Sequence, residues 1–285
     1  MTAIDRVGVV GAGQMGVGFA EICARAGLDV LVAASRPESA DRGRRQLERS
    51  LDRLVNKEKL SASDRSAALG LVTWSTDLKD LADRQFVLEA VVERLAPKQE
   101  IFATLDEIIT DPAAVLASTT SSLPIMKLGR ATENPSRVIG VHFFNPVPVM
   151  PLVEVISSLA TDTGTITRTT SFLTKTLGKQ VIAAKDQAGF VVNALLLPYL
   201  MAAVRMVESE TASAEDVDRG MTLGCGHPMG PLALIDLVGL DTVAAVGESM
   251  YAETKEPLHA PPALLLRMID GGYLGRKSGR GFYSY

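Results

Sequence analysis

The sequence predicts an α/β fold, a doubly wound sheet with a helical hairpin insertion, followed by an all-α C-terminal domain. A β-branched run at residues 6–11 ends in glycine, apolar residues then recur at helical spacing up to Gly27, and DVLVAAS at 29–35 returns to strand character. This order of strand, helix and strand is typical of a parallel sheet. After about residue 186 the apolar pattern is helical. We therefore expect two domains, residues 1–184 and 185–285.

The same kind of pattern predicts the elements between the first strand–helix–strand unit and the helical C-terminal part. Residues 38–70 are charged and amphipathic, which predicts the helical hairpin, with a break around NKEKLSASD. Further along, the short apolar runs LVTWS, FVLEAVV, AVLASTT and VIGVHFF are separated by helical or turn segments. They continue the alternation expected of a doubly wound sheet. The C-terminal third contains GFVVNALLLPYLMAAVRMVES and GPLALIDLVGLDTVAAVGESMYAET, both with helical periodicity.

Composition narrows the class of protein. The 285 residues are 47% hydrophobic and 22% charged, which is enough apolar material for a large core. A formal net charge of -4 offers no basic field for nucleic acid. Cys23 and Cys225 are the two cysteines, so we expect no disulfide framework, no metal site and a reducing, cytoplasmic location. No apolar stretch has the length of a membrane span or the pattern of a signal peptide.

The first candidate binding motif is the glycine-rich turn GAGQMG. It follows a predicted strand and opens a predicted helix, which is the context that a G-x-G-x-x-G dinucleotide site requires. One glycine allows the tight turn, one lets a pyrophosphate approach the backbone and one permits close packing of helix on strand, while the helix N-terminus stabilises the anion. The motif predicts a Rossmann-like domain whose cofactor-binding residues include Gly11, Gly13, Gln14, Met15 and Gly16.

The end of the second strand predicts which dinucleotide binds. An Asp or Glu normally accepts the ribose hydroxyls at this position, but the sequence has Ala34. The residues that follow, Ser35 and Arg36, offer a hydroxyl donor and a planar cation suited to phosphate. We therefore favour NADP(H) over NAD(H), which stays possible. The alternative is that Arg36 points to solvent, as most arginines do.

A histidine and a glutamate form the candidate catalytic pair. His142 ends one strand-like run in GVHFFNPVPVMPLVEVI, and Glu154 lies in the next. A histidine oriented by a carboxylate can take or return a hydroxyl proton, because the carboxylate selects its tautomer and stabilises the imidazolium. A purely structural role for His142 is the alternative.

Two polar segments complete the candidate site. LASTTSSLP ends a strand with hydroxyl groups, so Ser121 can hydrogen-bond a substrate carbonyl, while Ser121 or Ser122 can equally cap the next helix. No G-x-S-x-G turn surrounds these serines, which argues against a nucleophile. Asn193 interrupts an apolar helix and either pins helices together or donates into a site.

These segments, taken in order, resemble the L-3-hydroxyacyl-CoA dehydrogenase family nearly from end to end. The shared stretches include VGVVGAGQMG, FVLEAVVE, LASTTSSLPI, GVHFFNPVPVMPLVEVI, GFVVNALLLPYL, DVDRGMTLGCGHPMGPLALIDLVGLDT and GRKSGRGFYSY. The resemblance implies a catalytic pair of His142 and Glu154, with Ser121 and Asn193 contacting the reacting oxygen or orienting the histidine. Two departures are Ala34, in place of the family's acidic residue, and Thr119, where the family often has Asn.

The resemblance also implies further contacts. Glu93 and Lys98 match positions on the nicotinamide side of the cofactor. Candidates for binding the acyl-CoA substrate are Lys57, Lys59 and Ser61 in the hairpin, and Asn145 near His142. The helical C-terminal part resembles a dimerisation domain, so we expect a homodimer. Two alternatives to a 3-hydroxyacyl-CoA dehydrogenase are an enzyme of the same fold acting on a non-CoA hydroxy acid or carbonyl, and a non-catalytic nucleotide-binding protein.

Overall fold

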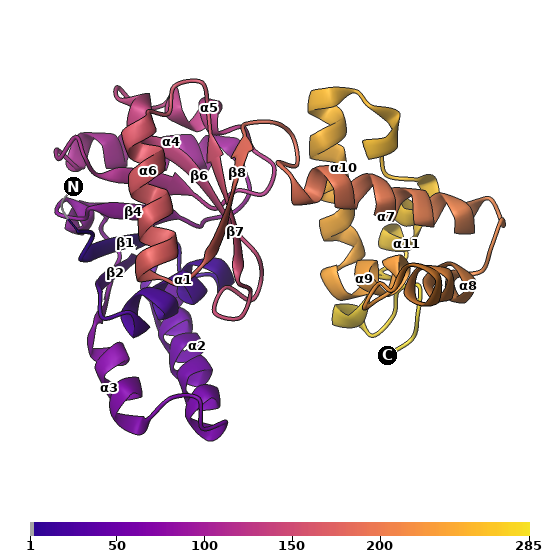
Figure 1. Cartoon of the computed structure of the whole chain (residues 1–285), viewed down its shortest axis with the longest axis horizontal. Helices are drawn as coiled ribbons and strands as arrows, with labels where there is room; N and C mark the ends of the chain where they lie inside the picture. Colours follow the sequence, from indigo (N-terminus) through magenta and orange to yellow (C-terminus); the bar gives the residue numbers. More distant parts are fainter. Residues whose placement is uncertain (1–2) are drawn as a thin grey trace. The chain divides into compact units, whose positions relative to one another are not determined.

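The chain divides into two compact units, an α/β unit that ends at Gln187 and a helical unit from Ala188 to Tyr285. The computed structural model describes residues 3–285. Figure 1 traces the sheet and its helices in the first unit and a helical array in the second. The predicted fold class is thus confirmed in both parts.

One eight-stranded sheet forms the core of the first unit, in the order β3-β2-β1-β4-β5-β6-β7-β8. The first six strands are parallel, β7 runs antiparallel to β6, and β8 is parallel to β7. The order reverses direction between β1 and β4, which makes this the switch point where ligands of open α/β sheets bind. The strands are β1 (Arg6–Val10), β2 (Asp29–Ala33), β3 (Val72–Ser75), β4 (Phe86–Glu89), β5 (Val115–Ser118), β6 (Val138–Phe143), β7 (Leu152–Ser157) and β8 (Gln180–Lys185).

Helices follow the strands and cover the sheet. Right-handed crossovers place α1 and α4 on opposite faces, because the chain leaves β1 and β4 in opposite directions across the sheet. Aromatic contacts mark the core on the α1 side, where Phe86 lies with its ring centroid 6.0 Å from Phe19 and 4.9 Å from Phe172. The helical segments are α1 (Gln14–Arg25), α2 (Pro37–Asn56), α3 (Ala62–Gly70), η1 (Leu78–Leu81), α4 (Leu95–Ile108), α5 (Ile125–Gly129), η2 (Pro135–Arg137), α6 (Thr163–Ser171) and the π-helical η3 (Phe172–Thr176).

The predicted helical hairpin is formed by α2 and α3, which extend from one end of the sheet (Figure 1). Proline at the first position starts α2, and the Ser61 side chain caps α3 by accepting from the Asp64 N–H at 3.0 Å. The inner face of α2 buries Leu47 and Leu51. A side chain at Gly43 would meet the Trp74 ring, so glycine allows α2 to pack closely on β3.

The second unit is helical and has its own apolar core, with Leu200, Met201 and Leu232 among its buried residues. Two buried carboxylates, Asp218 and Asp236, fasten its loops: Asp218 accepts from backbone N–H groups at the start of α9, and Asp236 accepts from those of the C-terminal tail. The helical segments are α7 (Val192–Glu208), α8 (Ala214–Arg219), the π-helical η4 (Gly220–Gly224), α9 (Pro231–Val238), α10 (Leu240–Thr254), η5 (Pro257–His259), α11 (Ala263–Asp270) and η6 (Arg276–Ser278). Within residues 3–285, no helix is both long enough and apolar enough to span a membrane.

Candidate active site

Three glycines shape the turn at the end of β1. Gly11 has a φ of +110°, and a Cβ there would lie 2.6 Å from the Ala90 carbonyl oxygen on the neighbouring strand connection. A Cβ at Gly16 would collide with the Gly11 carbonyl oxygen. Gly13 is the N-cap of α1 and its Cβ position faces open space. The turn can therefore bring backbone N–H groups and a helix N-terminus against a pyrophosphate, as the glycine motif requires.

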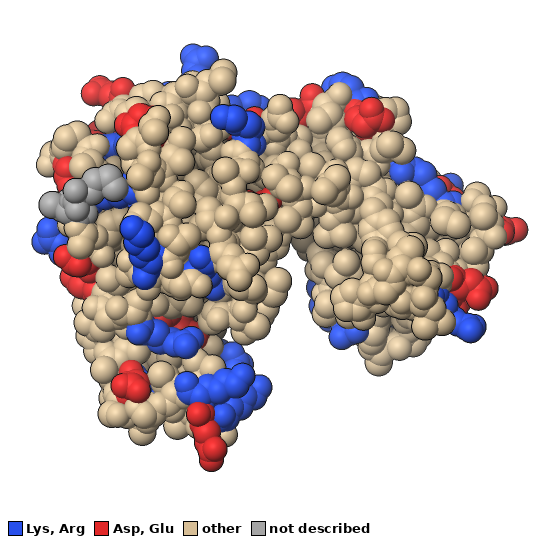
Figure 2. Space-filling view, in the orientation of Figure 1, with Lys and Arg blue, Asp and Glu red and all other residues tan. Residues whose placement is uncertain are grey.

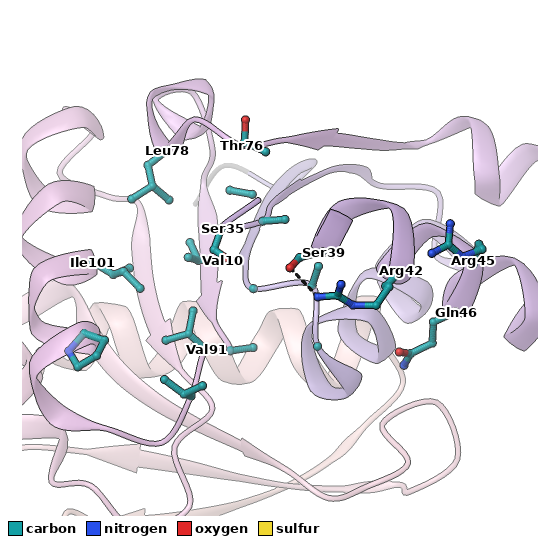
Figure 3. Close-up of a pocket in the computed structure, with 18 of the residues that line it drawn as sticks. Val10, Ser35, Ser39, Arg42, Arg45, Gln46, Thr76, Leu78, Val91 and Ile101 are labelled. Atoms are coloured by element: carbon teal, nitrogen blue, oxygen red, sulfur yellow. Dashed lines mark hydrogen bonds between the residues drawn. The ribbon is translucent and has the colours of Figure 1, made fainter. Parts of the chain in front are cut away.

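A cavity of about 1050 Å³ opens at this turn. Its walls come from the glycine turn, the end of β2, the outer face of α2 and the β4–α4 connection (Figure 3). Ser35 is among the lining residues, and the charged ones are Arg42, Arg45 and Arg49 of α2. A dinucleotide fits these walls, because the glycine turn can hold the pyrophosphate and the end of β2 lies where the adenosine ribose binds in this fold.

His142 and Glu154 face each other across the antiparallel pair β6 and β7. His142 Nδ1 lies 2.6 Å from Glu154 Oε2, and both side chains are buried. Because an ionised carboxylate only accepts hydrogen bonds, Nδ1 carries the proton and Nε2 is left as the acceptor. The ring also contacts Phe144, at 4.8 Å between centroids. The pair thus holds one imidazole nitrogen in the state needed for proton transfer.

The loop after β5 brings a hydroxyl to this imidazole. Ser121 Oγ lies 3.1 Å from His142 Nε2, so serine, histidine and glutamate form one hydrogen-bonded chain. These three hydrogen-bonded side chains have the connectivity of a catalytic triad. Unlike a triad built around a nucleophile, the histidine and glutamate lie at the carboxyl edge of a sheet, beside the glycine turn. A proton can therefore be passed at Nε2 to or from a substrate oxygen.

A buried cation sits between two carboxylates near the Ser121 loop. Lys98 is 1% exposed, and its Nζ lies 2.7 Å from Glu89 Oε1 and 3.3 Å from Glu93 Oε2. Glu89 also accepts from Ser118 Oγ at 2.6 Å. Sequence reasoning did not identify Glu89, although an acidic residue at the end of the buried run FVLE is a usable signal.

Glu93 fastens the loop that carries Ser121. Its Oε1 accepts from the Thr120 hydroxyl and from the backbone N–H groups of Ser121 and Ser122. Burial raises the pKa of Glu93, but the neighbouring Lys98 charge and the hydrogen bonds from Thr120 and Ser121 outweigh it, so the net pKa is lowered. Glu93 is therefore held ionised as an anchor of the loop.

The remaining candidates lie in several places. Gln14 Nε2 donates to Asn145 Oδ1 at 2.9 Å, which links the start of α1 to the loop after β6. Met15 packs against the hydrophobic core. Arg36 is the exposed N-cap of α2 and does not line the cavity, and Asn193 lies in the first turn of α7 in the second unit. Their predicted roles in binding and catalysis stay predictions.

The hairpin candidates lie together at its free end. Lys57 follows α2, Lys59 stands in the turn, and Ser61 precedes α3, all of them exposed. Figure 2 shows Lys and Arg side chains gathered at this end of the first unit. The Ser61 hydroxyl already caps α3 and donates to Asp64 Oδ2. Lys57 and Lys59 are therefore exposed cations at this end of the first unit.

Comparison with known proteins gives one consistent result over both units. The chain matches the 3-hydroxyacyl-CoA dehydrogenase NAD binding domain over residues 6–187 and the C-terminal domain of the same family over residues 189–285. A 3-hydroxybutyryl-CoA dehydrogenase of Mycobacterium tuberculosis is 57% identical over 283 residues, 99% of each chain. The crystal structure of M. tuberculosis FadB2 has a TM-score of 0.98 at 57% identity and full coverage, 100% of each chain. That of (S)-3-hydroxybutyryl-CoA dehydrogenase PaaH1 from Ralstonia eutropha has a TM-score of 0.94 at 44% identity, covering 99% of each chain.

Proposed function

Because the chain belongs to the 3-hydroxyacyl-CoA dehydrogenase family, we propose that it interconverts a short-chain (S)-3-hydroxyacyl-CoA, such as 3-hydroxybutyryl-CoA, and the 3-ketoacyl-CoA. The observation that carries this proposal is the hydrogen-bonded chain Ser121–His142–Glu154 at the same sheet edge as the glycine turn. It supplies a proton donor and acceptor where the fold binds a nicotinamide cofactor.

The side chains divide the proton transfer between them. In oxidation, His142 Nε2 takes the proton of the substrate hydroxyl as the C3–H bond breaks and the carbonyl forms. Nδ1 keeps its proton toward Glu154, whose negative charge stabilises the imidazolium. In reduction, His142 returns the proton to the 3-keto oxygen, and Ser121 donates to that oxygen as charge develops on it. We assign a second donor role to Asn193 on the resemblance alone.

The cofactor is a nicotinamide dinucleotide, and when bound it accepts the hydride from C3 or returns it. Gly11, Gly13 and Gly16 provide the turn for its pyrophosphate. NADP(H) is the proposed preference, because a carboxylate at the position of Ala34 would repel a 2′-phosphate, whereas Ser35 and the arginines near it favour one.

Replacing the histidine tests the catalytic assignment. His142→Gln removes the proton carrier, so kcat with acetoacetyl-CoA should fall by roughly 10²- to 10⁴-fold, the usual contribution of a positioned acid or base. Circular dichroism and the affinity for the cofactor, measured by fluorescence titration, should stay unchanged. A folded His142→Gln protein that keeps its kcat would contradict the assignment.

Steady-state assays of the wild-type protein at 340 nm separate the finer alternatives. We expect a much higher kcat/KM with acetoacetyl-CoA than with free acetoacetate. Comparable values would favour a non-CoA carbonyl as substrate, and no activity with either would favour a non-catalytic nucleotide-binding protein. A higher kcat/KM with NADPH than with NADH supports the proposed cofactor preference, and the reverse overturns that preference without affecting the reaction.

Two further roles rest on the resemblance. Lys57 and Lys59 at the free end of the hairpin are proposed contacts for the CoA phosphates, with Ser61 beside them. The second unit is proposed to mediate homodimer formation. Such an interface would cover apolar side chains that this unit exposes.

A further inference from the structure

We propose that Arg42, held in place by Ser39, is the residue that recognises the 2′-phosphate of the cofactor. This inference rests on the proposed preference for NADP(H). It assigns recognition of the 2′-phosphate to Arg42, which lies outside the Ala34-Ser35-Arg36 segment at the end of β2. Its starting observation is the charge of the cavity. Of the described residues that line it, the charged ones are Arg42, Arg45 and Arg49, and none is a carboxylate. The α2 side of the cavity therefore attracts anions.

The hydroxyl–guanidinium pair is built by the first turns of α2. Ser39 and Arg42 are three residues apart, so they lie on the same face of the helix. Arg42 Nη2 donates to Ser39 Oγ at 2.8 Å, and Figure 3 shows the two side chains meeting at the cavity. Because a guanidinium has five N–H groups in a fixed fork, one bond to Ser39 leaves the others to bind phosphate oxygens in a bidentate manner.

The end of β2 provides the space that this phosphate needs. Ala33 and Ala34 are buried and small, and Ser35 follows them into the cavity lining. The ribose binds at the end of this strand in dinucleotide-binding sheets, so its 2′ position would lie between β2 and the first turns of α2. Ser35 and Ser39 then offer hydroxyl donors on either side, and Arg42 offers the cation.

The other arginines fit this role less well. Arg36 is the N-cap of α2, has an exposed side chain and does not line the cavity. Arg45 and Arg49 do line it, but they lie roughly 4.5 Å and 10 Å further along the helix axis than Arg42, at 1.5 Å per residue. Figure 3 shows Arg45 and Gln46 further along α2, away from Ser35. Arg42 is therefore the cation of this wall nearest to the strand end.

Binding of two matched nucleotides tests the assignment independently of catalysis. 2′,5′-ADP and 5′-AMP differ by the 2′-phosphate alone, and calorimetry on the full-length protein gives a Kd for each. We expect Arg42→Gln to weaken 2′,5′-ADP by roughly 10- to 100-fold, as for a lost charge-assisted hydrogen-bond pair, and to leave 5′-AMP unchanged. The difference in Kd for 2′,5′-ADP between Arg42→Gln and the wild type should be smaller at high salt, because salt screens an exposed charge such as that of Arg42.

Two other variants separate the possible outcomes. Arg44→Gln removes an exposed charge of α2 that does not line this cavity, so it should leave both affinities unchanged. Arg36→Gln should weaken 2′,5′-ADP less than Arg42→Gln does. If Arg36→Gln causes the larger loss, the assignment to Arg42 is overturned and the NADP(H) preference stands. If the wild type binds 2′,5′-ADP no more tightly than 5′-AMP, the preference itself fails.

Discussion

A buried ion pair, Lys98 with Glu89, lies beneath the proposed active site. Lys98 is 1% exposed and Glu89 0%, so neither charge is stabilised by bulk water. Glu89 depends on Lys98, with Ser118 and the Val91 N–H as its further partners, and Lys98 also contacts Glu93, whose side chain is 39% exposed. Removing one partner of such a pair leaves an uncompensated buried charge, whereas removing both does not.

We expect Lys98→Met to lower the free energy of unfolding by about 3 to 5 kcal/mol, because Glu89 is left buried without its cation. The double variant Lys98→Met with Glu89→Gln should recover much of this loss. Urea unfolding followed by circular dichroism measures both. A single variant within about 1 kcal/mol of the wild type would show that water or another group stabilises Glu89.

The residue at the end of β2 gives a second prediction at this scale. Ala34→Asp places a carboxylate at the strand end where this fold binds the ribose hydroxyls, so on the proposed binding mode it should raise kcat/KM for NADH relative to NADPH, by roughly tenfold or more. Ala34→Asn, which has the same shape without the charge, is the matched control and should shift the ratio less. An unchanged ratio in Ala34→Asp would place the 2′-phosphate elsewhere.

At the scale of an element, the β5–α5 loop depends on one carboxylate from the β4–α4 connection. Glu93 gathers the Thr120 hydroxyl and two backbone N–H groups, and so positions Ser121 beside His142. Residues 119–122 of the loop are threonines and serines, and three of them donate to Glu93 Oε1. The geometry of the Ser121 hydroxyl, the proposed catalytic donor, therefore depends on the charge of Glu93.

This dependence has a pH signature. The pKa of Glu93 is lowered in the folded protein, so its contribution is present above the ordinary Glu pKa of about 4.3 and is lost as the pH falls through the lowered value. Glu93→Gln should cost about 1 kcal/mol at pH 7, a modest figure because the side chain is partly exposed to solvent. The difference in unfolding free energy between Glu93→Gln and the wild type should vanish at a pH below the lowered pKa of Glu93. Unfolding of both proteins at pH 7 and at that acid pH measures it. An equal difference at both would exclude ionisation as its cause.

At the scale of the whole molecule, each unit has its own apolar core, and the second unit also exposes large apolar side chains. Leu195 and Leu223 are 74% and 79% exposed, and Leu237 and Val238 of α9 are also exposed. Apolar side chains exposed in such numbers are typical of surfaces that another chain covers. They support the proposal that the second unit forms the dimer.

Light scattering after gel filtration tests the proposed dimer. The wild type should have twice the chain mass of 30.3 kDa, and Leu223→Glu should shift the population toward a single chain. Leu159→Glu, at a fully exposed leucine of the first unit, is the matched control and should leave the mass unchanged. A wild type of 30.3 kDa at micromolar concentration would refute the dimer.

Local patterns were sufficient for most of the fold. The spacing of apolar residues and the turn-forming residues predicted the first βαβ unit, the helical hairpin and the helical second unit. These features depend on residues that lie near each other in the chain. The antiparallel direction of β7 and the edge strand β8 were not predicted. QVIAAK in β8 is partly exposed and has no strong apolar alternation to mark it as a strand. Strand direction is decided by connections and pairing partners rather than by the strand's own residues.

The sequence by itself determined the residue types of the site: the glycine turn, His142, the hydroxyl loop and the missing acid at Ala34. Tertiary structure alone decided that Glu154 opposes His142 across β6 and β7, and that Ser121 reaches the same imidazole. It also decided that Arg42, rather than Arg36, faces the cavity. The reason is physical: chemistry is carried by side chains, but register, helix phase and burial set the distances between them, and these depend on contacts between residues far apart in the chain.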